Sequence, residues 1–251
     1  MPPPLHRRAL LALLLLLALV ARAPSSLADS VKPRVHVVAL GLFGEQDLFR
    51  REATAAATLL AQHFGHSGQL IVRANTSSRS GASLNDIRDT VQGLASAIDR
   101  QSDVLVLFLT SHGNQNGLAI VNRGSNRPAF LTPDSLAATL KATGIRHRVV
   151  IISACYSGVF LENLADDETL VITAADARHS SFGCSDDNKG DYTYFGQAFF
   201  AESLKPGLSL DQVFTSAKAR IADREAAEHL TGSNPQMKGG ATVLAKLARQ
   251  P

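Results

Sequence analysis

Tryptophan is absent from this sequence of 251 residues, and cysteine, methionine and tyrosine are scarce, with two, two and three residues. The 18 glycines and 10 prolines follow no short repeat. These shortages exclude a collagen-like or low-complexity chain, and a hydrophobic fraction of 45% excludes a disordered one. The composition is that of a globular protein, and its length suits one domain or two small ones.

An excess of charge of one sign is also missing once the N-terminus is set aside. Lys and Arg number 25 against 22 Asp and Glu, which gives a net charge of +3. Residues 1–28 contain Arg7, Arg8 and Arg22 but no acidic residue, so the rest of the chain has 22 basic and 22 acidic residues. A neutral chain gives no support to nucleic acid or an anionic membrane as the partner.

Only one long hydrophobic run occurs, and it lies near the N-terminus. A positively charged segment, residues 6–8, precedes thirteen uninterrupted apolar residues at 9–21. This run is shorter than the roughly 20 residues that span a bilayer, and residues 26–28 resemble a signal-peptidase site. We therefore predict a signal peptide over residues 1–28 and a mature domain over residues 29–251 without a stable membrane anchor. An uncleaved anchor is the alternative.

Behind this segment, stretches with strand and helix periodicity alternate without an internal repeat. Strands are expected at 34–40, 69–74, 104–110, 118–121, 149–154 and 169–174, and helices at 47–63, 83–100, 132–144, 194–203 and 209–229, followed by a short tail element at 241–248. Segments 104–110 and 149–154 are apolar at almost every position, as central strands of a parallel sheet are. The alternation predicts an α/β fold, a three-layer sandwich with a mostly parallel central sheet of about six strands.

The two most apolar strands end in unusual motifs. The first runs into Ser-His-Gly, with His112 and Gly113, and the second into Ala-Cys-Tyr-Ser-Gly, with Cys155. Chemistry in open α/β sheets gathers at the carboxyl ends of the strands. An imidazole that takes the proton of a thiol makes it a nucleophile, and the amides of Gly113 and Cys155 could form an oxyanion hole. We therefore predict a catalytic Cys155–His112 pair, with a buried structural cysteine and a core histidine as the alternative.

These motifs and their spacing resemble those of the legumain family of cysteine peptidases, family C13 of the caspase-like superfamily. In both, an apolar strand ends in His-Gly, and about forty residues later another ends in Ala-Cys-x-Ser-Gly. The resemblance covers most of the chain after the signal segment, most clearly residues 35–202. It implies a caspase-like fold, Cys155 as nucleophile, His112 as general base and cleavage after Asn or, less readily, Asp.

Two further stretches carry the resemblance to the specificity pocket of that family. Residues 49–53 resemble its aromatic-Arg-His-Gln-Ala stretch, which makes Arg50 a substrate-binding residue. Residues 180–184 and 190–192 resemble its Ser-Ser-Tyr-Ala-Cys loop and the following Gly-Asp-Trp, which gives Asp191 the same role. A solvated helix face for Arg50 and a turn position for Asp191 are the alternatives.

The sequence departs from the family pattern at two positions. Ser153 stands two residues before the nucleophile, where the family has a Glu that lines the pocket. If Ser153 binds substrate there, the pocket is formally neutral and tolerates Asp more readily. The third catalytic residue of the family, an Asn, aligns with Leu48, with Asp47 one position away. The residue that orients His112 is therefore not evident from the sequence.

The cysteine count conflicts with the motif. Two cysteines in an exported protein form a disulfide by default, which would pair Cys155 with Cys184. A nucleophilic Cys155 has to be free, and we expect the motif to prevail. The thiol state separates an enzyme from a disulfide-bonded α/β binding protein.

Three functions stay open on the sequence alone. The first is an exported cysteine endopeptidase or transpeptidase, the second a catalytically inactive member of the same fold, and the third a disulfide-bonded binding protein. We expect a peptide or protein substrate as partner and a periplasmic or secreted location, lysosomal or vacuolar in a eukaryote. The scattered histidines show no metal-ligand spacing, so neither a metal nor another cofactor is expected.

Overall fold

The structure, a computed structural model, describes residues 33–122, 127–185 and 188–248. The predicted signal peptide, residues 1–28, lies outside these ranges, as does its expected boundary with the mature domain. Within the described ranges no helix combines the length and the apolar character needed to cross a bilayer.

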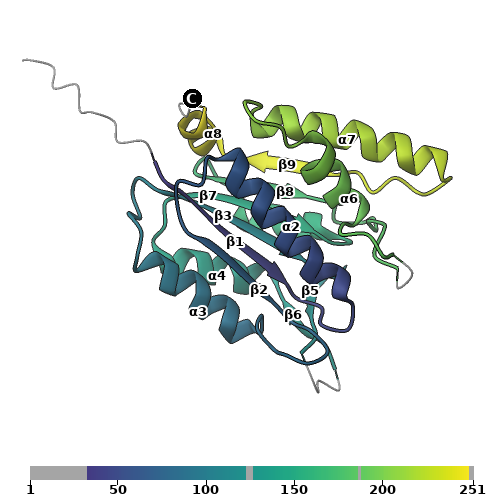
Figure 1. Cartoon of the computed structure of the whole chain (residues 1–251), viewed down its shortest axis with the longest axis horizontal. Helices are drawn as coiled ribbons and strands as arrows, with labels where there is room; N and C mark the ends of the chain where they lie inside the picture. The colour runs from purple at the N-terminus through teal and green to yellow at the C-terminus, as the bar shows by residue number, and fades with distance from the viewer. Residues whose placement is uncertain (1–32, 123–126, 186–187, 249–251) are drawn as a thin grey trace, which may run out of the picture. The chain divides into compact units, whose positions relative to one another are not determined.

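A six-stranded sheet forms the centre of the domain (Figure 1). Its strands in chain order are β1 (Val35–Gly41), β2 (Leu70–Ala74), β3 (Val104–Thr110), β7 (His147–Ser153), β8 (Thr169–Thr173) and β9 (Gln236–Gly239). The spatial order is β2-β1-β3-β7-β8-β9, and every neighbouring pair is parallel except β8 and β9. This arrangement confirms the predicted α/β fold with a mostly parallel sheet of about six strands.

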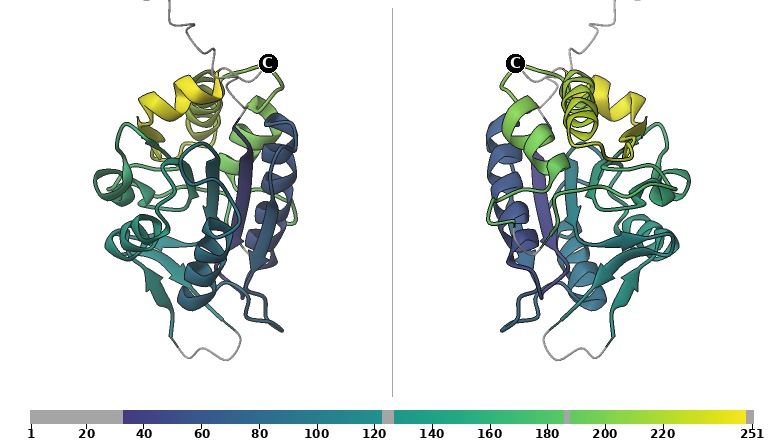
Figure 2. Two further views of the ribbon diagram at one scale, coloured as in Figure 1. Left: turned by 90° about the vertical axis from the view of Figure 1, so that its left-hand side faces the viewer. Right: turned by 90° about the vertical axis from the view of Figure 1, so that its right-hand side faces the viewer.

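Helices cover both faces of the sheet (Figures 1 and 2). One face carries α2 (Asp47–His63), α6 (Tyr194–Gly196), η2 (Gln197–Ser203), α7 (Leu210–Ala227) and α8 (Ala241–Leu247). The other carries α3 (Leu84–Ala95), α4 (Pro133–Thr143), η1 (Ser157–Phe160) and α5 (Leu161–Leu164). Alternate side chains of β1 enter the two layers, with Val37 on the first face and Val38 on the second. Strands buried on both sides must be apolar throughout, as the sequence pattern indicated.

Several elements differ from the sequence-based expectation, among them η1 and α5, which were not predicted. The predicted helix 194–203 is one α-helical turn followed by the π-helix η2, whose adjacent Phe199 and Phe200 are both fully buried. In that core, the Phe199 ring packs against Phe195 and the Phe200 ring packs against Phe108. The predicted helix 83–100 ends at Ala95. Strand β9 was not predicted because its sequence, QMKG, is short and polar.

A small antiparallel sheet follows β3 on the side where that strand ends. It consists of β4 (Gly113–Asn114), β5 (Gly117–Ile120) and β6 (Ala129–Leu131). Of these, only the central strand was expected, at residues 118–121. The amide of Ala119 in β5 donates to the carbonyl of His112 at 2.9 Å, so the small sheet holds the segment that leaves β3.

A buried carboxylate fastens the opposite end of the central sheet. Asp103 is 3% exposed and accepts hydrogen bonds from the backbone and guanidinium of Arg34, at 3.1 and 2.8 Å, and from the amide of Asp99 at 3.0 Å. His36 Nε2 lies 3.1 Å from the same carboxylate. Burial by itself raises the pKa of Asp103, but these hydrogen bonds outweigh burial and hold that pKa below its usual value.

We predict that Asp103→Ala lowers the free energy of unfolding by about 1–3 kcal/mol at pH 7, because the buried His36 and three partly buried donors from Arg34 and Asp99 lose their acceptor. Urea unfolding measures this loss. The folded-state pKa of Asp103 is depressed, so its contribution is complete above pH 4 or so and disappears as pH falls through the folded pKa. The exposed Asp89→Ala in α3 is the control. A loss as small as that of the control contradicts the prediction.

Candidate active site

The pairing of β3 with β7 brings the two predicted motifs together. Thr110 is the register partner of Ser153, and the amide of Ser111 donates to the Ser153 carbonyl at 3.2 Å. A Cβ atom at position 113 would collide with the carbonyl oxygen of Cys155, so only glycine fits there. The segments that follow β3 and β7 are therefore in direct contact. They lie beside the point where the strand order reverses between β1 and β3, the usual place of a binding crevice in such sheets.

The imidazole of His112 has a polar contact with Gln46 and aromatic contacts with Phe43 and Phe49. Its Nε2 lies 2.7 Å from Oε1 of Gln46, the residue that precedes α2. The rings of Phe43 and Phe49 approach it edge-on, with centroids 4.6 and 5.0 Å away. Because an amide oxygen only accepts, the Gln46 contact places the proton of a neutral imidazole on Nε2 and makes Nδ1 the basic nitrogen. Gln46 is therefore a candidate for the residue that orients His112, which was not evident from the sequence.

The chain turns sharply after Cys155, and the motif residues make this turn possible. Tyr156 adopts φ 56°, a left-handed conformation that is unusual for a residue with a side chain. The hydroxyl of Ser157 accepts from the amide of Ala175 at 3.1 Å, which ties the turn to the end of β8. A Cβ atom on Gly158 would collide with the backbone of Asp176. Ser and Gly in the Cys-x-Ser-Gly motif are thus explained by packing.

Both cysteines are free thiols, and they interact with one another. A hydrogen bond from Cys184 is the largest influence on Cys155 and lowers its pKa to about 6, against the opposing effect of burial. The amide of Ser181, 3.3 Å from Sγ of Cys155, lowers that pKa further. The same thiol contact, together with burial, raises the pKa of Cys184. The contact therefore favours the thiolate form of Cys155 and the protonated form of Cys184.

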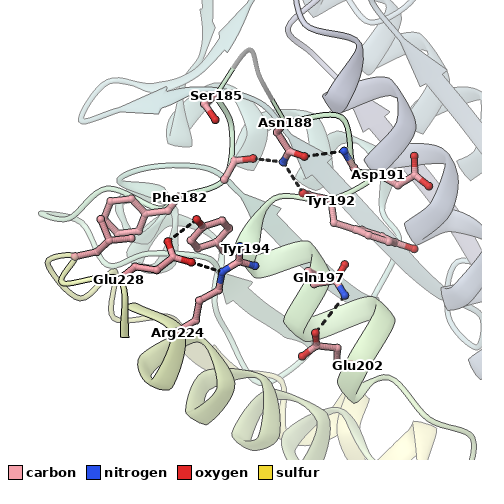
Figure 3. A pocket seen from close by; sticks show the side chains of 13 residues that line it. Phe182, Ser185, Asn188, Asp191, Tyr192, Tyr194, Gln197, Glu202, Arg224 and Glu228 are labelled. Carbon is pink, nitrogen blue, oxygen red and sulfur yellow. Dashed lines mark hydrogen bonds and ion pairs between the residues drawn. The ribbon is translucent and has the colours of Figure 1, made fainter. Parts of the chain in front are cut away.

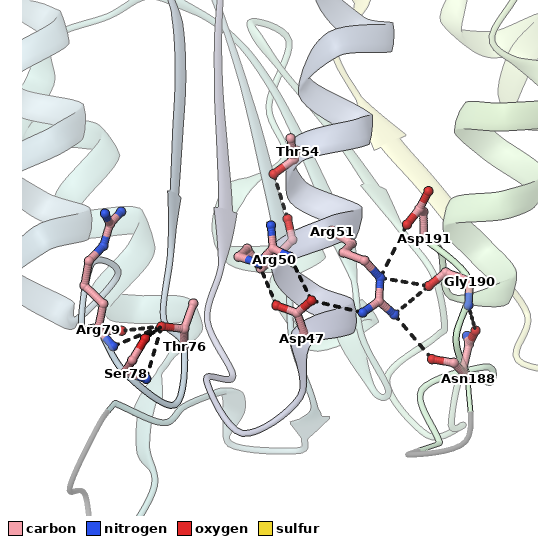
Figure 4. A network of polar contacts seen from close by, with 10 residues as sticks. All are labelled: Asp47, Arg50, Arg51, Thr54, Thr76, Ser78, Arg79, Asn188, Gly190 and Asp191. Carbon is pink, nitrogen blue, oxygen red and sulfur yellow. Dashed lines mark hydrogen bonds and ion pairs between the residues drawn. The ribbon is translucent and has the colours of Figure 1, made fainter.

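The predicted pocket residues Arg50 and Asp191 belong to one charged network at the start of α2 (Figure 4). Arg50 forms a bidentate ion pair with Asp47, at 2.6 and 2.7 Å. The neighbouring Arg51 is the residue in contact with Asp191, at 3.3 Å, and it also donates to the Gly190 carbonyl at 2.7 Å. Arg50 forms no described hydrogen bond with Asp191, but the two opposite charges attract each other. The sequence analysis did not recognise Arg51, because the family pattern has a His there.

Ser153, the third predicted substrate-binding residue, lies below the surface. It is 1% exposed, and its hydroxyl is 3.0 Å from Oγ1 of Thr193. That hydroxyl therefore belongs to a buried polar cluster at the end of β7. The contact of Ser153 with a substrate stays a prediction.

A cavity of about 630 Å³ adjoins this region, between the described residues 182–185 and 188–194 on one side and α7 on the other (Figure 3). Asp191 lines it and is shared with the charged network. Elsewhere in the wall, the hydroxyl of Tyr194 donates to Glu228 at 2.6 Å, and the guanidinium of Arg224 lies 3.3 Å from the centroid of the Tyr194 ring. Neither His112 nor Cys155 is among the lining residues. The cavity is an extension of the candidate site rather than its centre.

The fold and the paired His and Cys strand ends define a candidate cysteine peptidase with a caspase-like architecture. A model of the Peptidase C13 family matches residues 85–243, and the chain belongs to that family. The solved structure of caspase-1 from Spodoptera frugiperda is similar, with 14% sequence identity, a TM-score of 0.54 and coverage of 83% of this chain and 87% of that chain. At this identity the likeness shows the fold. No curated protein matches the sequence.

Family membership confirms the resemblance drawn from the motifs, and family and fold together support a cysteine peptidase. The catalytic and substrate-binding roles of individual residues stay predictions. The sequence analysis missed Arg51 and three further residues: Gln46, Cys184 as a partner of Cys155, and Glu52, which is fully buried in α2. Gln46 had a local signal, as a polar residue just before a predicted helix, and Cys184 lies in a stretch that resembles the family.

We predict that the rate of Cys155 alkylation by iodoacetamide rises with pH around a midpoint of about 6, well below the value of about 8.5 for an ordinary thiol. Cys184→Ala removes the hydrogen bond that contributes most, so the midpoint moves upward. Cys184→Ser keeps a donor and serves as the matched control, with a midpoint closer to that of the wild type. A midpoint that is the same in all three proteins contradicts the assignment. Alkylation of the unreduced wild type also tests whether Cys155 is free.

Proposed function

We propose that the protein is an exported cysteine endopeptidase that cleaves after Asn, and secondarily after Asp, through a Cys155–His112 dyad. The observation that carries this proposal is the register of β3 and β7, which sets Gly113 of the first motif against Cys155 of the second. The lowered pKa of Cys155 supports it, because the thiolate is the nucleophilic form. Export rests on the segment at residues 1–28 and directs the protein to the periplasm or outside the cell.

The reaction follows from the groups at the strand ends. The Cys155 thiolate attacks the carbonyl carbon of the scissile bond, and the N–H groups of Gly113 and Cys155 stabilise the oxyanion. Protonated His112 gives its proton to the leaving amine, which leaves a thioester on Cys155. His112 then takes a proton from water, which attacks the thioester and releases the acid. The Gln46 contact keeps Nδ1 as the nitrogen that exchanges protons in these steps.

Hydrolysis and peptide ligation share this thioester, and an amine in place of water gives a transpeptidase. An inactive member of the fold was the main alternative because no orienting residue for His112 was evident. The contact between Gln46 and His112 weakens one of the two arguments for an inactive protein, the lack of an orienting residue. The replacement of the pocket Glu by Ser153 is the other.

The charged network favours a carboxamide side chain at the position before the cut. The oxygen of Asn accepts from a guanidinium of Arg50 or Arg51, and its amide donates to Asp191. An Asp side chain meets Asp191 as a like charge, which disfavours it unless one of the two is protonated. Asp191 is 62% exposed and Arg50 is 43% exposed, so both are accessible to a peptide.

We predict that Cys155→Ala abolishes cleavage of a fluorogenic Asn peptide and that His112→Ala nearly does, because nucleophile and base are lost. Gln46→Ala lowers kcat by about tenfold to a hundredfold with little change in KM, because the imidazole loses its orientation. Initial rates on folded protein measure these effects, and Cys184→Ser serves as the cysteine control. Activity of Cys155→Ala within tenfold of the wild type contradicts the mechanism.

A peptide library tests the pocket separately. We predict cleavage after Asn, acceptance of Asp that increases as pH falls, and little cleavage after Lys or Arg. Arg50→Ala lowers kcat/KM for an Asn substrate by about 30-fold, or about 2 kcal/mol, and Asp191→Asn narrows the preference for Asn over Asp. Arg146→Ala, whose partner is Glu168 at the opposite end of β7, is the control. A profile led by basic or bulky apolar residues contradicts this pocket but not the Cys155–His112 chemistry.

A further inference from the structure

A single carboxyl group lies buried beneath the candidate site. Glu52 is 0% exposed and points inward from α2, whereas Arg50 and Arg51 on the same turn reach the surface. Its Oε1 accepts the amide and the hydroxyl of Thr193 at 3.0 and 2.7 Å, and its Oε2 accepts the hydroxyl of Thr110. The hydroxyl of Ser153 joins this cluster through Oγ1 of Thr193, 3.0 Å away, and it counteracts the rise in the pKa of Glu52.

The residues of this cluster around Glu52 come from three segments that are far apart in the sequence. Thr110 is the last residue of β3, two positions before His112, and Ser153 is the last residue of β7, two positions before Cys155. Thr193 follows Asp191 by two positions and caps α6, with its hydroxyl accepting from the amide of Gly196 at 3.1 Å. The carboxyl group of Glu52 therefore lies where the segments that carry His112, Cys155 and Asp191 meet.

The surrounding packing is built around this carboxyl group. A Cβ atom on Gly196 would collide with Oε1 of Glu52, so α6 approaches closely only because residue 196 is glycine. Burial raises the pKa of Glu52, and the hydrogen bonds from Thr110, Thr193 and Ser153 counteract this effect. An apolar residue would fill the site at a lower cost in desolvation free energy. Stability alone therefore does not account for an acid at this position.

We infer that Glu52 is the positioning residue of the active site, which sets the distances between His112, Cys155 and Asp191 by hydrogen-bonding to the segments that carry them. The inference rests on the proposed peptidase function, since it assigns these three residues their roles. Glu52 does not touch substrate and acts through Thr110, Ser153 and Thr193. Displacing a catalytic group by about 1 Å costs an enzyme about a hundredfold in rate, so loss of this tie has a large effect on kcat.

The experiment compares Glu52→Ala and Glu52→Gln with a matched control, Asp103→Asn. Asp103 is a buried carboxylate at the opposite end of the same sheet, and its removal weakens the fold without touching the strand ends. Kinetic constants of the purified protein are measured on an Asn peptide, per alkylatable Cys155, at a temperature where each variant is folded. Glu52→Ala is expected to lose about a hundredfold in kcat, and Asp103→Asn to keep kcat within about twofold of the wild type.

Glu52→Gln is the rescue variant. Its amide oxygen still accepts from Thr193, and its NH₂ group donates to the Thr110 hydroxyl, so kcat is expected within about fivefold of the wild type. Thr110→Val removes one tie without changing the volume of the side chain, and its kcat is expected to fall about tenfold. Thr110→Val takes the place of Glu52→Ala if the latter does not fold. Wild-type kcat in folded Glu52→Ala, or in Thr110→Val, overturns the inference.

Hydrogen–deuterium exchange tests the same ties without any substrate. Glu52→Ala, or Thr110→Val in its place, is expected to speed exchange in segments 110–113, 153–157 and 189–194 relative to the wild type. Asp103→Asn is expected to leave these segments unchanged. If the wild type cleaves no peptide but Glu52→Ala shows this pattern, the proposed function fails and the positioning role of Glu52 stands. Unchanged exchange in all three segments overturns the inference.

Discussion

The parallel register of β3 and β7 runs without a bulge from Val104 opposite His147 to Thr110 opposite Ser153. A slip by one residue would move the alternating side chains of either strand into the opposite layer, where side chains of different size and shape would no longer fill the core. Because both faces are buried, the hydrophobic cores on the two sides fix the register that the site requires. The chemistry at the carboxyl ends of these strands therefore depends on packing along their whole length.

The first turns of α2 bring opposite charges to the two sides of one helix. Successive residues are about 100° apart around a helix axis, so consecutive positions face different surroundings. Arg50 and Arg51 reach the charged network on the outside, and Glu52 reaches the buried hydroxyls at the strand ends. The helix thereby links the surface that would meet a peptide to the layer that holds the strands.

Much of the fold was predictable because its signals are local. Apolar strands such as 104–110 and the periodicity of the helix 47–63 were evident from a few neighbouring residues, and so were the motifs containing His112 and Cys155. The contacts of the site were not predictable in the same way. His112 and Gln46 are 66 positions apart, and Thr193 and Glu52 are 141 apart, so only the folded chain reveals them. The widened helix at 197–203 likewise depends on how two adjacent phenylalanines pack.

That widened helix has a consequence for insertions and deletions in this protein. A π-helical turn holds one residue more than an α-helical turn of the same rise, so η2 stores one residue of extra chain between Thr193 and α7. Deleting one residue within 197–203 would restore regular winding and rotate the two ends of the segment against each other by about 100°. Either the phenylalanines would leave the core or Thr193 would turn away from Glu52. The segment 197–203 therefore has to keep its exact length. Substitutions at its outward-facing positions are expected to be tolerated.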